Sequence, residues 1–231
     1  MTKWPAILAL VAGLGLVDGA SAVLASDRAS VPSTYGDAMR WYRKSAEKGD
    51  PAAQFYWGLI LERGIQGARP NPVAAQAWYR KAAKQGNGLA AFKLGQMAHL
   101  GLVGPVDAAD ARRWYEQAVG RGVAAAAYNL ALLLESDAGG PAMPKRALAL
   151  YARAARGGVA MAALNRGRML AQHPGVPRNF EAAFMWVAIA EGLGAEVDPA
   201  VKKAFASQLS AADIADALVR ANAWLAARGA K

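Results

Sequence analysis

The sequence predicts an all-α protein: a right-handed α-solenoid of stacked helix-turn-helix repeats, closed at its C-terminal end by a capping helix pair. One large side chain recurs at steps of 37, 36, 36 and 36 residues, at Trp41, Trp78, Trp114, Leu150 and Trp186. Small residues keep the same register, and a glycine follows each large residue by eight positions. A fixed period of this length is typical of repeat proteins, whose units bury their apolar faces against one another.

The first helix of each unit, called helix A, is predicted from capping residues and one apolar face. Seven residues before the large position stand Thr34, Asn71, Asp107, Met143 and Asn179, four of which have a side-chain oxygen that can cap a helix. Alanine stands three residues before the large position and a small residue four after it, so these columns share one helix face. The predicted A helices are 35–48, 72–85, 108–121, 144–157 and 180–193.

A glycine turn and a second helix, called helix B, complete each unit. The glycines are Gly49, Gly86, Gly122, Gly158 and Gly194, and we expect them to end helix A in the left-handed conformation. After the turn, a large apolar column and a small column recur at helical spacing. The large column holds Phe55, Phe92, Tyr128 and Leu164, and the small column holds Gly58, Gly95, Ala131 and Gly167. The predicted B helices are 51–63, 88–100, 124–136 and 160–171.

The C-terminal region departs from the repeat pattern. Asp198 and Pro199 start a new helix, because an aspartate cap followed by proline favours helix initiation. A last amphipathic helix is predicted from Ser210 to Arg228. Its apolar face holds Ile214, Ala217, Leu218, Ala221 and Leu225, and Trp224 can join it. We expect repeats over 34–197, in units 34–70, 71–106, 107–142, 143–178 and a partial unit 179–197, and a cap over 198–231, since the last unit of a solenoid faces water on one side.

These columns resemble the Sel-1-like repeat family, relatives of the tetratricopeptide repeats with a longer unit. The segments that carry the resemblance are Ala75-Gln-Ala-Trp78-Tyr79-Arg-Lys-Ala82-Ala83-Lys-Gln-Gly86 and Ala91-Phe-Lys-Leu94-Gly95. It covers about residues 34–225, and it is weakest in the fourth unit, where Leu150 replaces Trp, Met143 replaces the cap and Arg166 replaces a leucine. The resemblance implies an α-solenoid that scaffolds or regulates other proteins, with helix A on the concave face and no shared catalytic residue.

The N-terminus has the features of a secretory signal peptide. Lys3 supplies a positive start, Ile7 to Val17 is an uncharged, mostly apolar run, and Ala20-Ser21-Ala22 fits a small-residue cleavage site. We predict a signal peptide at 1–22, cleaved after Ala22, a flexible lead-in at 23–33, and a periplasmic or secreted protein with no stable membrane span after cleavage. The run is shorter than the about 20 residues of a spanning helix, and an uncleaved anchor stays the alternative.

The chain is strongly basic, with a net charge of +10. Lys44, Lys81 and Arg153 share one column of helix A, three residues after the large position. We predict a basic concave groove for an acidic protein or peptide, or for an anionic envelope polymer; the alternative is an ordinary solvated face. The predicted contact residues are Arg43, Lys44, Arg80, Lys81, Lys84, Arg113 and Arg153. Nucleic acid is not an expected partner of an exported protein.

No catalytic residue, metal or cofactor is predicted. The two histidines, His99 and His173, stand in different units, and a zinc site needs further ligands. Ser45-Ala-Glu-Lys48 matches the Ser-x-x-Lys pattern of penicillin-recognising enzymes. However, Ser45 stands in the small packing column and the partner motifs are absent. The sequence therefore predicts a protein that is not an enzyme, and a penicillin-interacting hydrolase is the least favoured alternative.

The sequence thus predicts an exported interaction scaffold or regulator that binds a protein or peptide in its groove. The main alternative is an envelope protein that adheres to peptidoglycan or anionic polysaccharide by charge. Within the core, we expect Trp41, Trp78, Trp114 and Trp186 to wedge between neighbouring hairpins, so that Trp→Ala costs about 3–5 kcal/mol. The tyrosines one residue later, Tyr42, Tyr79, Tyr115 and Tyr151, face either the groove or the seam between units.

Overall fold

The computed structural model describes residues 35–64, 69–136 and 139–229. In these ranges the chain forms eleven α-helices and no strand, which confirms the all-α prediction. The predicted signal peptide and the whole predicted lead-in lie outside the described residues, as does Thr34, the predicted cap of the first helix.

The helices alternate between A and B along the chain. The A helices are α3 (Tyr35–Glu47), α5 (Pro72–Lys84), α7 (Ala108–Gly120), α9 (Pro144–Arg156) and α11 (Phe180–Gly192). The B helices are α4 (Pro51–Arg63), α6 (Gly88–Leu100), α8 (Ala124–Glu135) and α10 (Ala160–Gln172). Two more helices, α12 (Pro199–Ala206) and α13 (Ala211–Gly229), follow at the C-terminal end. The repeat helices agree with the predicted ranges to within one residue at each end.

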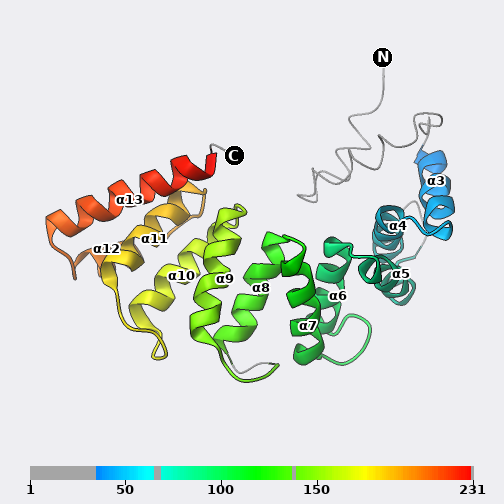
Figure 1. Cartoon of the computed structure of the whole chain (residues 1–231), viewed down its shortest axis with the longest axis horizontal. Coiled ribbons are helices and arrows are strands. Elements are labelled where there is room, and N and C mark those ends of the chain that lie inside the picture. Colours follow the sequence, from blue (N-terminus) through cyan, green and yellow to red (C-terminus); the bar gives the residue numbers. More distant parts are fainter. Residues whose placement is uncertain (1–34, 65–68, 137–138, 230–231) are drawn as a thin grey trace, which may run out of the picture.

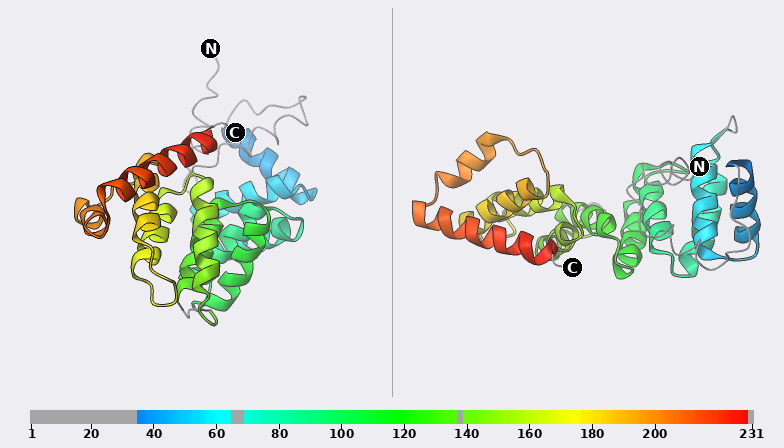
Figure 2. Two further views of the ribbon diagram at one scale, coloured as in Figure 1. Left: turned by 60° about the vertical axis from the view of Figure 1, so that its left-hand side comes forward. Right: turned by 90° about the horizontal axis from the view of Figure 1, so that it is seen from above.

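The helices follow one another along an arc, with α3 at one tip and α12 and α13 at the other (Figure 1). Over the middle of the arc, the loops that join units lie along the outer edge, whereas the short turns between helix A and helix B lie on the inner side. Seen from above, the array is elongated, and the same helices occupy its two ends (Figure 2). The C-terminal end of α13 comes close to the turn that follows α9.

Capping side chains start the described A helices α5, α7 and α11 as the sequence predicted. The oxygens of Asn71, Asp107 and Asn179 accept hydrogen bonds from backbone N–H groups three residues later, at 2.9, 2.8 and 2.8 Å. Met143, which has no such oxygen, makes no side-chain cap before α9. The glycines of the five turns have φ between 85° and 101°. At Gly122 a methyl group would meet no atom within 4 Å, so glycine is required there by backbone conformation alone.

The rings that fill the seam between units are tyrosines, which corrects the expectation for the tryptophans. Each helix B packs more extensively against helix A of the next unit than against its own. Tyr79, Tyr115 and Tyr151 are 0, 1 and 0% exposed. A methyl group on Gly95 would lie 2.5 Å from Cδ1 of Tyr115, and one on Gly58 would lie 2.6 Å from Cε1 of Tyr79. At Gly58 and Gly95 the small column of helix B therefore makes room for the tyrosine of the next unit, whereas at Gly167 the neighbouring side chain is Val187.

The first three repeat tryptophans lie at the edge of the seam rather than inside it. Trp41, Trp78 and Trp114 are half-buried, whereas Trp186 is 6% exposed. The ammonium of Lys81 lies 3.9 Å above the ring of Trp78, and the Trp114 indole donates to Asp110 at 3.2 Å. Because these three indoles are only half-buried, we expect Trp→Ala at these positions to cost less than the ~3–5 kcal/mol predicted from the sequence.

The capping helices cover α11, the last A helix. The indoles of Trp186 and Trp224 meet edge to face with their centroids 5.5 Å apart. Ala217 of α13 and Phe205 of α12 are buried in a cluster with Phe184 and Val187 of α11. Leu218, predicted on the apolar face, is instead 37% exposed. Ala217 and Ala221 are buried and Trp224 packs against the core, as predicted, so Leu218 is the departure from the predicted face.

Candidate functional site

The tyrosine hydroxyls of the seam are held by the helix B that precedes them. Tyr79 donates to Glu62 at 2.5 Å, and Tyr151 donates to Glu135 at 2.7 Å. The hydroxyl of Tyr115 lies 3.5 Å from Nδ1 of His99, which holds the equivalent position. These three tyrosines therefore face the seam, not the groove, and the candidate contact surface has to be made of other side chains.

Alkaline pH is expected to unfold the protein through these hydroxyls. Burial raises the pKa of Tyr115 from 10.0 to about 12, and burial followed by the neighbouring glutamate raises the pKa of Tyr79 and Tyr151 as well. Because the folded-state pKa exceeds the unfolded one, the stabilisation is complete below pH 10 and is lost as the pH rises through about 12. The melting temperature should be flat to about pH 9 and fall above about pH 10.

Tyr115→Phe is the control for this effect, because it removes one titrating hydroxyl and keeps the ring. Its melting temperature should fall with a shallower slope above about pH 10 than that of the parent chain. Equal slopes, or a melting temperature that ignores pH over this range, would show that the seam tyrosines do not govern alkaline stability.

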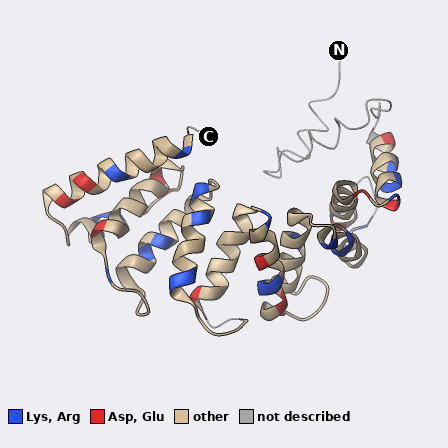
Figure 3. Cartoon of the chain, viewed as in Figure 1, with Lys and Arg blue, Asp and Glu red and all other residues tan. Residues whose placement is uncertain are grey.

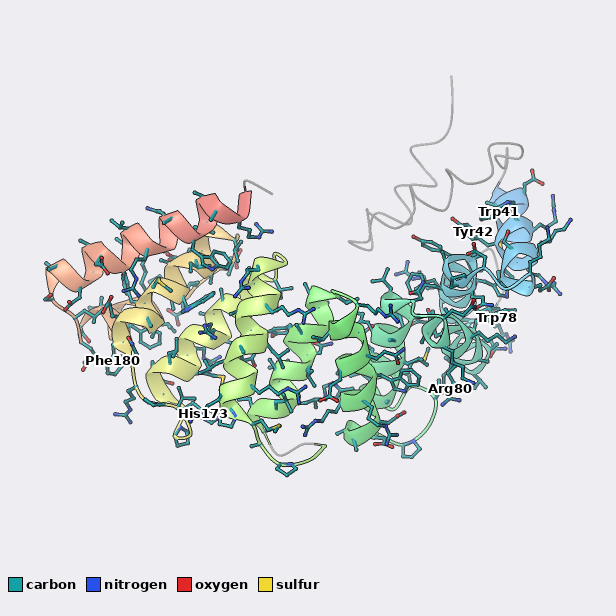
Figure 4. The ribbon with its side chains drawn as sticks, viewed as in Figure 1. Trp41, Tyr42, Trp78, Arg80, His173 and Phe180 are labelled. Carbon is teal, nitrogen blue, oxygen red and sulfur yellow. The ribbon has the colours of Figure 1, made fainter. Side chains whose placement is uncertain are left out.

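Two of the seven predicted contact residues are neutralised by neighbours on their own helix. Arg43 pairs with Glu47 at 2.9 Å, and Arg113 pairs with Asp110 at 2.8 Å. Four others, Lys44, Arg80, Lys81 and Lys84, are exposed and form no ion pair with any carboxylate of the described residues. We call these four the N-terminal cations; Figure 4 shows Arg80 beside Trp78, near the N-terminal end of the arc.

The seventh predicted residue, Arg153, has a structural contact. Its guanidinium donates to the carbonyl of Val119 in the preceding helix A. Gln117, which occupies the same column one unit earlier, donates to the carbonyl of Ala83 at 2.9 Å. This column therefore ties the C-terminal ends of successive A helices together. The predicted row of Lys44, Lys81 and Arg153 is not one uniform set of free cations.

The structure brings Arg153 together with two arginines that sequence reasoning did not select. Arg156 of α9 and Arg228 of α13 line the same pocket as Arg153, and Trp224 forms part of its wall. The Nε of Arg228 donates to the carbonyl of Arg156 at 3.0 Å, across 72 positions of sequence. Lys and Arg positions, blue in Figure 3, occupy the end of α9 that faces the C-terminal end of α13. In the sequence, Arg156 stands in the same column of helix A as Lys84, six residues after the large position, but nothing local links it to Arg228.

Arg166, the main departure of the fourth unit, also lies near the cap. Its guanidinium carbon stands 4.8 Å above the ring of Trp186, and its Nη1 donates to the carbonyl of Leu148. Its Nε finds no partner among the described residues. Burial, followed by the like charge of Arg156, lowers the pKa of Arg166. The irregular fourth unit therefore adds positive charge where the repeats meet the capping helices.

The described residues show no metal cluster. They contain no group of three or more His, Asp or Glu side chains that could hold a metal ion. His99 lies in the seam against Tyr115, and Nδ1 of His173 accepts from the backbone of Gly175 at 3.0 Å. Ser45 is half-buried in the small packing column of α3. None of the helices in this part of the chain has the length and apolar character to cross a membrane.

Comparison with known proteins agrees with this architecture. The family model described as Sel1 repeat matches residues 33–50, 51–87, 88–123, 124–159 and 160–194. No curated protein matches. A Sel1 repeat protein from Oxalobacter formigenes is 27% identical, with a TM-score of 0.65, and the alignment covers 83% of this chain and 85% of that one.

A second solved structure shows the same fold at lower identity. It is a protective antigen of uropathogenic Escherichia coli with an SLR fold, 24% identical, with a TM-score of 0.72. The alignment covers 88% of this chain but only 44% of the antigen. This likeness concerns the fold alone.

Proposed function

We propose that this chain, which belongs to the Sel1 repeat family, is an exported interaction scaffold or regulator that binds an acidic segment of another protein. Proteins of this family are in general non-catalytic scaffolds that bind proteins. The observation that carries the proposal is the set of N-terminal cations, which are exposed on successive A helices without a carboxylate partner in the described chain.

Charge favours this partner over an uncharged one. Each exposed ion pair contributes only about 0–1 kcal/mol, so one cation cannot hold a partner. Several cations presented by a rigid array add their contributions and also speed association with an acidic surface. Such binding weakens as salt screens the charges, with a screening length of about 8 Å at physiological ionic strength. Salt-sensitive binding of an acidic partner is therefore the signature of this function.

The test is charge reversal at the N-terminal cations, with cross-linking in the native cell envelope and mass spectrometry as readout. Lys44→Glu, Lys81→Glu and Lys84→Glu together should abolish capture of the partner and lower the melting temperature only slightly, since Lys81 loses its contact with the Trp78 ring. Arg153 is left intact because of its bond to Val119. The same spectra should show a mature N-terminus at Val23, as export with cleavage after Ala22 requires.

A matched control changes the same charge elsewhere. Lys145, Arg178 and Lys203 are also exposed and form no ion pair among the described residues, so their triple replacement by Glu should keep the partner. If both triple variants capture the partner as the parent does, the N-terminal cations are a solvated face. If both lose it, and binding to purified cell-wall material falls in parallel, adhesion by net charge is the better account.

A further inference from the structure

A pocket of about 480 Å³ lies where the fourth unit meets the capping helices. Its volume is within the about 300–1,000 Å³ of ordinary ligand sites. It is lined by α9, by the turns after α7 and α9, by the first residue of α8 and by the C-terminal end of α13. The lining residues are Gly122, Ala124, Arg153, Arg156, Gly157, Trp224, Ala227 and Arg228. The wall is thus one indole, two methyl groups and glycine backbone, together with three guanidinium groups.

The three arginines have no anion of their own. None of the ion pairs formed within residues 35–64, 69–136 and 139–229 includes Arg153, Arg156 or Arg228. Three like charges around one pocket repel one another, and the cost grows as water is excluded. An incoming anion would remove that repulsion. A folded chain that keeps such a cluster is therefore prepared for a negatively charged ligand.

Two of the guanidinium groups are held in place before any ligand arrives. Arg228 donates one N–H to the carbonyl of Arg156 at 3.0 Å, and Arg153 donates one to the carbonyl of Val119. A methyl group on Gly158 would lie 2.7 Å from Nη2 of Arg228, so the glycine turn is what admits this side chain. A guanidinium group has five N–H donors, so each of these two keeps four donors for a ligand. Groups fixed in advance lose little entropy on binding.

We propose that this pocket, which we call the cap pocket, binds the carboxylate of an acidic side chain in the partner, with an aliphatic neighbour of that residue packed on Trp224. The inference rests on the proposed function and names the chemistry of one contact. The planar fork of arginine matches a carboxylate in a two-bond geometry. The apolar wall favours a peptide over a polysaccharide, because sugar hydroxyls would find no hydrogen-bond partners on an indole and methyl groups.

The probe is a fluorescent peptide with one glutamate between two leucines and both ends blocked, measured by anisotropy against the full chain. Its partner probe carries glutamine in place of glutamate. The glutamate peptide should bind at least about tenfold more tightly, since hydrogen bonds to charged groups are worth about 1.5–3 kcal/mol. Arg156→Gln and Arg228→Gln should each weaken the glutamate peptide at least about tenfold and leave the glutamine peptide unchanged. Arg168→Gln, on an exposed arginine outside the pocket, should bind as the parent does.

Three results would overturn the proposal that the cap pocket binds a carboxylate. They are equal binding of the two peptides, equal binding to Arg156→Gln and the parent, and displacement of the peptide by inorganic phosphate or polyglucuronate at equal concentration. Circular dichroism of each variant shows that it is folded. The Lys44, Lys81 and Lys84 triple variant separates this inference from the proposed function. This triple variant should bind the peptide normally while it loses its envelope partner. Loss of peptide binding in the arginine variants alone would identify the cap pocket as the peptide-binding site.

Discussion

Tyr115→Ala is expected to lower the free energy of unfolding by about 3–5 kcal/mol, as for a large ring removed from a closed core. The ring is 1% exposed, lies against Gly95 and stands 5.9 Å from Phe92 between centroids. Nothing else can fill the space, because the facing position has no side chain. Since this seam joins α6 to α7 near the middle of the array, its loss should uncouple the two ends of the solenoid.

Trp114→Ala is the matched comparison, one residue earlier on the same helix. Its indole is half-buried at the edge of the seam, so the expected cost is about 1–2 kcal/mol. Tyr115→Phe keeps the ring and loses the hydroxyl that accepts from Asn129 at 3.3 Å, which should cost about 1 kcal/mol. Urea unfolding followed by circular dichroism measures all three. A larger cost for Trp114→Ala than for Tyr115→Ala would show that the tryptophan, not the tyrosine, fills the seam between these units.

Ala217→Asp is expected to detach the capping helices. Ala217 is 0% exposed and lies in a cluster with Phe184, Val187 and Phe205, which offers a carboxylate no polar partner. An uncompensated charge in such a site costs about 3–5 kcal/mol. Undocking α13 relieves that cost and exposes Trp186 and Trp224, so tryptophan fluorescence should shift to the red. Binding of the glutamate peptide should also be lost, because α13 supplies Trp224 and Arg228 to the cap pocket.

Ala215→Asp adds the same charge to the same helix at an exposed position. It should leave both the fluorescence maximum and peptide binding unchanged. If Ala217→Asp bound the peptide as tightly as Ala215→Asp, α13 could not be part of the binding site. If neither variant changed the fluorescence, the packed face of α13 would have to be another one. The pair therefore tests the cap and the pocket together.

The cap gives the solenoid a feature that a plain repeat array lacks. Trp186 meets Trp224 on one side and the guanidinium of Arg166 on the other, so the aromatic end of the array is bordered by positive charge. Repeats alone present similar side chains at each step. Here the C-terminal end of α13 comes back toward the turn after α9 (Figure 1) and adds Arg228 and Trp224 to the pocket beside the fourth unit. The fourth unit thereby differs in its chemistry from the other repeats.

Local signals along the chain specify the helices and their order. Caps such as Asn71 and Asp107, and turn glycines such as Gly122, act within four residues of themselves, so their effect can be read along the chain. Helical periodicity is equally local, which is why the predicted repeat helices match the structure to within one residue at each end. The family pattern follows from the same local columns.

The packing of the helices against one another sets which ring is buried and where the basic side chains meet. Trp114 and Tyr115 are neighbours on one helix, and the crossing of α6 and α7 over Gly95 selects the tyrosine. Arg153 and Arg113 both read as exposed cations, yet one bonds to another helix and the other pairs with its own. Arg156 and Arg228 meet across 72 positions because α13 packs along α11. Burial and long-range proximity depend on how helices cross, and no local pattern encodes that crossing.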